Sequence, residues 1–206
     1  QGSTAPQGRP TAQIVRQPVF IIATAACAIG YGVMNLLMAA TPIAMAQCHH
    51  PFSAAALVLE WHVLAMFVPS FFTGRLVKRF GALPVMAAGL ALNVGCVVFA
   101  LGGQEVMHFL GALTALGVGW NFLFIGGSTL VTETYAPEEK TRAQGAVDFC
   151  VYTTMTITSF SSGALVTTGG WRAMNLGSIA PLLLLAAALG WLALLRRGAS
   201  APAARA

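Results

Sequence analysis

The chain has 206 residues, of which 57% are hydrophobic and only 8% are charged, and its formal net charge is +5. Because a soluble domain carries about 25% charged residues, this composition excludes the ordinary soluble classes and indicates a membrane protein. The positive charge does not indicate a nucleic-acid partner, since the Lys and Arg residues flank hydrophobic segments and form no basic groove.

The first segment, residues 1–17, is rich in Gly, Pro, Ser, Thr and Gln, which predicts a cytoplasmic linker. It lacks the apolar central region of a secretory signal. Because the first residue is not Met, we expect the chain to be a fragment whose N-terminal part is missing.

Six later stretches are apolar over about the 20 residues that a helix needs to cross a bilayer. They are residues 18–40, 54–74, 84–102, 108–131, 145–167 and 174–195. Their apolar residues are consecutive, whereas apolar and polar residues alternate along the strands of a membrane β-barrel. An open sheet is excluded because its edge strands would leave backbone hydrogen-bonding groups unpaired in lipid. We therefore predict an all-α membrane protein with a six-helix transmembrane domain over residues 18–197 and a disordered cytoplasmic tail over residues 198–206.

The Lys and Arg residues set the predicted topology. Ten of the eleven fall in the lead, in the loops after the second and fourth stretches, and in the tail, whereas the opposite side has only Arg172. Positive charge stays in the cytoplasm, so both termini are expected there. An even number of spans leads to the same expectation.

Two acids lie within the predicted spans, Glu60 and Asp148, and are candidates for proton coupling because ionisable groups in a membrane usually face an interior or a water path. Asp148 shares a helical face with Tyr152, Thr156 and Ser159, which is expected to face the bundle. The structural alternative is that Asp148 pairs with a loop arginine or caps a neighbouring helix. For Glu60 the functional and structural interpretations both stay open.

Two amides lie near the middle of their spans, Asn35 in the first and Asn121 in the fourth. They either bond neighbouring helices or line a solute cavity, in which Tyr31, Trp120 and Phe124 would offer stacking surface. The glycines around Asn121 permit close helix approach.

Two other kinds of chemistry find little support. Cys48, His49 and His50 could ligate a metal, but three consecutive residues rarely converge on one ion, so neither a metal nor a cofactor is expected. Ser128 follows two glycines, as in intramembrane serine proteases, but no histidine follows it to serve as the base.

Two loop patterns carry a family resemblance. Residues 74–81 read GRLVKRFG and are similar to the pattern G-x-L-x-D-R-x-G, with Lys78 in place of the acid. The matching positions are Gly74, Leu76, Arg79 and Gly81. A second pattern combines Glu133, Pro137, Arg142 and Gly145. At this spacing, the chain resembles the C-terminal six-helix half of a major facilitator superfamily transporter.

The resemblance implies two six-helix halves that rock around a solute at the midplane. The first and fourth helices of each half would line the cavity, which assigns it Tyr31, Asn35, Trp120, Asn121 and Phe124. A cytoplasmic gate would consist of Arg75 and Arg79 pairing with acids such as Glu133.

The predicted function is thus secondary transport of a small organic solute (a metabolite, a vitamin or a drug-like molecule), with proton coupling left open. The expected partners are the solute, the lipid bilayer, and the missing N-terminal half or a second copy of the chain. The expected location is a bacterial inner membrane. The alternatives are an intramembrane enzyme and a non-transporting membrane scaffold.

Overall fold

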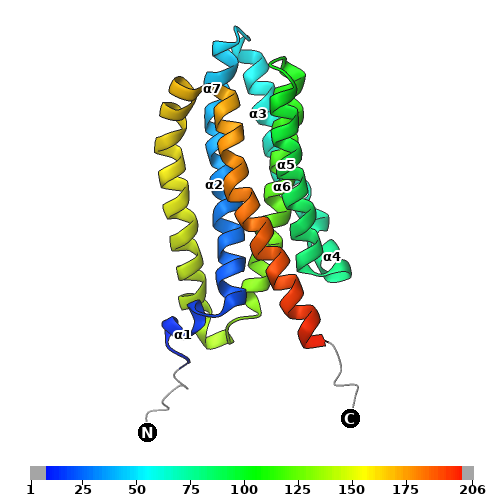
Figure 1. The fold of residues 1–206 in the computed structure, drawn as a ribbon, viewed down its shortest axis with the longest axis vertical. Helices are drawn as coiled ribbons and strands as arrows, with labels where there is room; N and C mark the ends of the chain where they lie inside the picture. Colours follow the sequence, from blue (N-terminus) through cyan, green and yellow to red (C-terminus); the bar gives the residue numbers. More distant parts are fainter. Residues whose placement is uncertain (1–7, 201–206) are drawn as a thin grey trace.

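The computed structural model describes residues 8–200, and within that range the chain forms helices and no strand (Figure 1). The elements are α1 (Thr11–Val15), α2 (Pro18–Gln47), α3 (Phe52–Phe67), α4 (Ser70–Phe80), α5 (Ala82–Gly102), α6 (Val106–Thr132), the 3₁₀ turn η1 (Pro137–Glu139) and α7 (Lys140–Ser200). The long helices lie side by side along the long axis of the molecule.

α7 consists of two helices that meet at Gly170. Its 61 residues would extend about 90 Å at 1.5 Å per residue, far more than the ~30 Å of a bilayer core. Gly170 has a φ of 73°, a backbone conformation that favours glycine, and in Figure 1 the chain reverses direction in this part of α7. We call residues 140–169 the first leg and residues 171–200 the second leg.

By length and composition, α2, α5, α6 and α7 could each cross a membrane, and the bent pair α3–α4 could form one more span. The sequence predicts one continuous helix over residues 54–74, but the structure divides it between α3 and α4 with a bend of 41°. The break lies at Pro69, whose missing N–H leaves the carbonyl of Ala65 without its helical donor. α4 then continues to Phe80, so the predicted loop with the glycine/arginine pattern is largely helical.

α2 also runs further than predicted. The predicted stretch ends at residue 40, and a proline inside a helix usually ends or kinks it, yet α2 contains Pro42 and continues to Gln47. The neighbouring Thr41 donates its hydroxyl to the carbonyl of Leu37 at 2.7 Å, one turn earlier in the same helix.

α6 is the central helix of the bundle, since it packs against α2, α3, α4 and α5. Two of its glycines show why small residues are needed there. A Cβ atom at Gly119 would lie 2.8 Å from the carbonyl oxygen of Gly89 in α5, and one at Gly127 would lie 3.0 Å from that of Ala23 in α2. The expectation that glycines around Asn121 permit close helix approach is confirmed at these positions.

The segment before α2 is folded in the part that the structure describes. The predicted linker covers residues 1–17, of which 1–7 lie outside the described residues, whereas residues 8–17 include α1 with a fully buried Ile14. α1, the start of α2 and the end of the second leg lie at the same end of the bundle. The predicted tail lies mostly outside the described range, and α7 itself ends at Ser200.

Candidate solute-binding site

Four aromatic side chains of α2, α3 and α6 meet within the bundle. Trp120 and Phe124 of α6 are stacked with ring centroids 5.3 Å apart, and Tyr31 of α2 meets both edge-on at 5.2 and 5.8 Å. Phe67, at the end of α3, meets Trp120 at 6.4 Å. These separations are typical of favourable aromatic pairs. We call Tyr31, Phe67, Trp120 and Phe124 the aromatic cluster.

The aromatic cluster has a buried side and an open side. Trp120 is only 6% exposed, Tyr31 and Phe124 are half-buried, and Phe67 is 58% exposed. The open rings offer an apolar, flat surface of the kind that lines small-molecule sites. Sequence reasoning missed Phe67, although its place just before a proline inside an apolar span marks it as a residue at a helix break.

Asn121, next to Trp120, is bonded entirely to the α3–α4 break. Its amide nitrogen donates to the carbonyl of Met66 at 2.8 Å and to the hydroxyl of Ser70 at 2.6 Å. Its amide oxygen accepts from the hydroxyl of Thr73 at 2.7 Å, and the side chain is 2% exposed. The geometry is that of an interhelical connector, and contact of Asn121 with a solute stays a prediction.

Asn35 plays the corresponding part toward α7. Its amide nitrogen lies within bonding distance of the hydroxyls of Thr158 and Ser159, at 2.9 and 2.8 Å, and of the carbonyl of Met155 at 3.2 Å. These bonds connect α2 to the first leg one helical turn after Tyr31. Asn35 is 7% exposed, so its role toward a solute also stays a prediction.

The two candidate acids lie on outward surfaces. Glu60 is exposed on α3 and lines a shallow groove with Leu59, Val63 and Leu64, whereas His62 is fully buried and bonded to the carbonyl of Leu113 at 2.7 Å. Glu60 and His62 thus face different surroundings.

The polar face of the first leg is also uncovered. Its members, Asp148, Tyr152, Thr156 and Ser159, are all exposed, with Tyr152 at 63%. The Ser159 hydroxyl is contacted by Asn35 of α2, but all four side chains remain exposed, although this face was expected to face the bundle.

The acid of the predicted gate has another partner in this structure. Glu133 pairs with Arg196 of the second leg at 2.6 Å instead of with Arg75 or Arg79. Both of these arginines are exposed on α4, and Arg79 lies 5.2 Å from the ring centre of Phe80. The physical reason is that the second leg returns to the end of α6, which brings Arg196 closer to Glu133 than the sequence alone could indicate.

The described residues form neither of the two other candidate sites, the metal site and the serine protease site. No group of three His, Cys, Asp or Glu side chains there could hold a metal ion, and His50 instead lies 2.7 Å from the carbonyl of Gln104. The nearest polar side-chain contact of Ser128 is the thiol of Cys27 at 3.9 Å, which is no general base.

Comparison with known proteins agrees with this membrane architecture. The family model of the Major Facilitator Superfamily matches residues 20–206. Over 168 residues the chain is 48% identical to the riboflavin transporter RfnT of Brucella anthropi, an alignment that covers 82% of this chain and 42% of that protein. It is 32% and 31% identical to YdeG and YddS of Bacillus subtilis, both named as uncharacterized MFS-type transporters, over 74% of this chain and 36% of each of them.

The chain therefore spans less than half the length of these relatives. The family and the relatives are transporters, not enzymes, so the alternative of an intramembrane enzyme is wrong. Together with its apolar helices, the match makes the chain an integral membrane protein. The chain belongs to the Major Facilitator Superfamily.

Proposed function

We propose that the chain is the C-terminal six-helix half of a secondary transporter that carries a small organic solute by alternating access. The observation that supports the proposal is the aromatic cluster, in which rings from α2, α3 and α6 meet and are partly exposed. Transporters of this architecture bind solute at the midplane between two repeats.

The helices support a count of six spans. The bent pair α3–α4 counts as one, and the two legs of α7 count as two. With six spans, both ends of the bundle domain lie on one side, and the distribution of Lys and Arg places that side in the cytoplasm. We place the protein in a bacterial cytoplasmic membrane, in keeping with its bacterial relatives.

The uncovered polar face of the first leg supports a second half that is absent from this chain. Polar and charged side chains facing lipid are costly, and Asp148 with Tyr152 and Thr156 would face lipid if nothing covered them. A partner bundle removes this cost. We propose that the N-terminal half supplies that bundle, and a second copy of the chain is the alternative.

For the solute we propose a flavin, with riboflavin as the first compound to test. The relative that is 48% identical is named as a riboflavin transporter. Riboflavin is uncharged at neutral pH and has a planar tricyclic ring. Such a ring can stack against Tyr31, Phe67 or Phe124, and the cluster offers no charged group that would favour an ion instead. Asn35 and Asn121 would hold the helices around the ring, and any direct contact of theirs with the solute would add specificity.

The test is riboflavin uptake by the full-length protein in proteoliposomes. Truncation of Trp120 to Ala removes the ring that holds the cluster together and should raise KM about tenfold, because the aromatic pairs it makes are worth roughly 0.5–1.5 kcal/mol each. The control is Trp191→Ala, since Trp191 is 51% exposed on the second leg and away from the cluster. Equal uptake by the wild type and Trp120→Ala, or no uptake by the wild type, would refute the proposed site or solute.

The same vesicles test proton coupling. Uptake is compared with and without an imposed pH gradient, for the wild type and for Glu60→Gln and Asp148→Asn. We expect one of these variants to lose the stimulation by the gradient. If both keep it, neither acid carries the proton. A non-transporting scaffold is excluded by any saturable uptake that depends on Trp120.

A further inference from the structure

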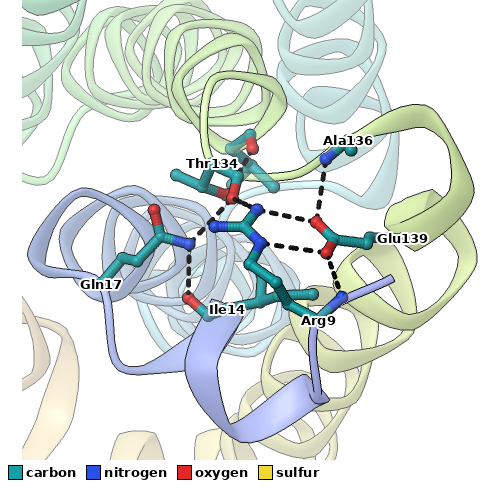
Figure 2. Close-up of polar contacts among 7 residues, drawn as sticks. Arg9, Ile14, Gln17, Thr134, Ala136 and Glu139 are labelled. Atoms are coloured by element: carbon teal, nitrogen blue, oxygen red, sulfur yellow. Dashed lines mark hydrogen bonds and ion pairs between the residues drawn. The ribbon is translucent and has the colours of Figure 1, made fainter. Parts of the chain in front are cut away.

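The segment before α2 is tied to the connection between α6 and α7 by an ion pair in which Glu139 is buried and Arg9 is 46% exposed (Figure 2). Arg9 donates from Nη2 to Oε2 of Glu139 at 2.7 Å and from Nε to Oε1 at 3.0 Å. The backbone N–H of Arg9 donates to the same Oε1 at 2.6 Å. The backbone N–H of Ala136 completes the set by donating to Oε2 at 2.9 Å.

The carboxylate of Glu139 thus has two donors on each oxygen, although it is only 2% exposed. These hydrogen bonds, above all those from Arg9, lower the pKa of Glu139 from its ordinary 4.5 to about 2. A fully exposed ion pair contributes little, but here the carboxylate is buried, so loss of Arg9 would leave a buried charge without its partner. The contact is therefore an attachment point and not an incidental surface pair.

A second attachment lies beside it. The carbonyl of Thr134 accepts from Nη2 of Arg9 at 3.0 Å and from the side-chain amide of Gln17 at 2.8 Å. Between these two residues, α1 carries Ile14, which is fully buried, and Gln17 also donates to the carbonyl of Ile14 at 3.2 Å. The whole stretch from Arg9 to Gln17 is thus held against residues 134–139.

The position of this attachment connects it to the candidate site. Gln17 directly precedes α2, which carries Tyr31, and Thr134 follows α6, which ends at Thr132 and carries Trp120. The attachment therefore fixes the cytoplasmic ends of the two helices whose aromatic rings meet in the cluster. On the other side of the same connection, Glu133 pairs with Arg196 of the second leg.

We propose that Arg9 and Glu139 are positioning residues of the transport cycle, which form a cytoplasmic latch between the chain entering α2 and the α6–α7 connection. The proposal rests on the proposed function, in which the preceding half is joined to this one through that entering chain. While the latch is closed, a displacement of the entering chain moves α2 and α6 together. When it is open, the same displacement is absorbed by residues 8–17, and the aromatic cluster opens to the cytoplasm at a different rate.

The first experiment measures the latch without any solute. Full-length protein is digested with trypsin, and cleavage after Arg16, an exposed residue of the latched stretch, is followed over time. Glu139→Gln should accelerate cleavage at least about tenfold, because the guanidinium of Arg9 loses its charged partner. The matched control Glu138→Gln changes a neighbouring, exposed acid and should not accelerate it. Unchanged cleavage in Glu139→Gln would overturn the latch, whichever solute the protein carries.

A variant that keeps every charge gives an independent check. A Cβ atom at Gly8 would lie 2.6 Å from Cγ of Glu139, so Gly8→Ala should displace the acid and release the stretch as Glu139→Gln does. If Gly8→Ala leaves cleavage unchanged, the side-chain packing around Glu139 does not hold the segment, and the latch as described is wrong.

The second experiment measures the consequence for the site. A single cysteine replaces Phe124 in a background where the accessible Cys48 and Cys150 are serine, and its labelling by an impermeant maleimide is timed from the cytoplasmic side. Glu139→Gln should change the labelling rate at least about threefold, whereas Glu138→Gln should not, because loosening a packed connection shifts the balance between two arrangements. Release of the segment without a change in labelling would overturn the positioning role.

Riboflavin uptake then separates this proposal from the proposed function. Glu139→Gln should change Vmax several-fold and leave KM within about twofold, because the latch does not touch the solute. An equal change in KM would indicate a role in solute binding and overturn the positioning role. If the wild type takes up no riboflavin, the proposed solute fails, while cleavage and labelling still decide the latch.

Discussion

Replacing Asn121 with alanine should lower the free energy of unfolding by about 2 kcal/mol. The substitution removes three interhelical contacts, to the carbonyl of Met66 and the hydroxyls of Ser70 and Thr73. Side-chain hydrogen bonds between membrane helices average about 0.6 kcal/mol and reach about 1.7, so three of them amount to roughly 2 kcal/mol. Their loss also leaves the Met66 carbonyl without its side-chain donor close to the break at Pro69.

The matched control is Asn93→Ala. Asn93 is 1% exposed in α5, like Asn121 in α6, but its amide nitrogen bonds only the carbonyl of Gly89 one turn earlier in the same helix, at 2.9 Å. Its amide oxygen has no partner among the described residues. Its truncation removes the same atoms with no interhelical bond, so it should cost less than about 1 kcal/mol.

Reversible unfolding of the full-length protein in mixed detergent micelles, followed by circular dichroism, measures both variants. Thr73→Val removes one of the three contacts of Asn121 and the bond from the Thr73 hydroxyl to the carbonyl of Pro69, and it should be less destabilising than Asn121→Ala. If Asn121→Ala is no more destabilising than Asn93→Ala, the bonds to the helix break do not stabilise the bundle and the connector interpretation is refuted.

Three further predictions concern other parts of the bundle. Hydrogen bonds lower the pKa of Glu139 in the folded protein from 4.5 to about 2. The latch should therefore be fully closed above pH 4.5 and should open as the pH falls toward 2. The distance between spin labels on α1 and η1 would report this opening. Gly127→Ala should lower stability by about 1–3 kcal/mol in thermal unfolding, since its Cβ would lie 2.7 Å from the Cys27 thiol, whereas Gly95→Ala, which meets nothing within 4 Å, should not. A cysteine at Tyr152 should react rapidly with a water-soluble maleimide in this chain alone and slowly in the full-length protein, and equally fast labelling in both would argue against a second half on that face.

Much of the architecture follows from the sequence because lipid constrains it so strongly. A backbone in hydrocarbon must satisfy its own hydrogen bonds, so long apolar stretches become helices, and the charge between them indicates which side they face. The same reasoning located the reversal between the last two helices, where Gly170 supplies a backbone conformation that other residues avoid. The family resemblance assigned Tyr31 of the first predicted helix and Trp120 and Phe124 of the fourth to one cavity, and the three rings do meet in the structure.

The sequence could not predict which side chains pair across the bundle, because this depends on how helices distant in the chain are rotated and where they end. Glu133 was matched to arginines of the neighbouring loop, yet the second leg returns Arg196 to it across 63 residues. Asn121 was assigned to a cavity, and only the structure shows that its amide bonds the carbonyl of Met66 and the hydroxyls of Ser70 and Thr73 around the break at Pro69. Arg9 was assigned to a linker, and its bond to the buried carboxylate of Glu139 spans 130 residues.

Hydrophobicity and charge act along the chain and can be read from it directly. The sequence by itself therefore determined that the long apolar segments are helices and which family the chain resembles, and it predicts their orientation. Hydrogen bonds and ion pairs act over about 3 Å and require two groups to be placed together, and only the tertiary structure decided which groups those are.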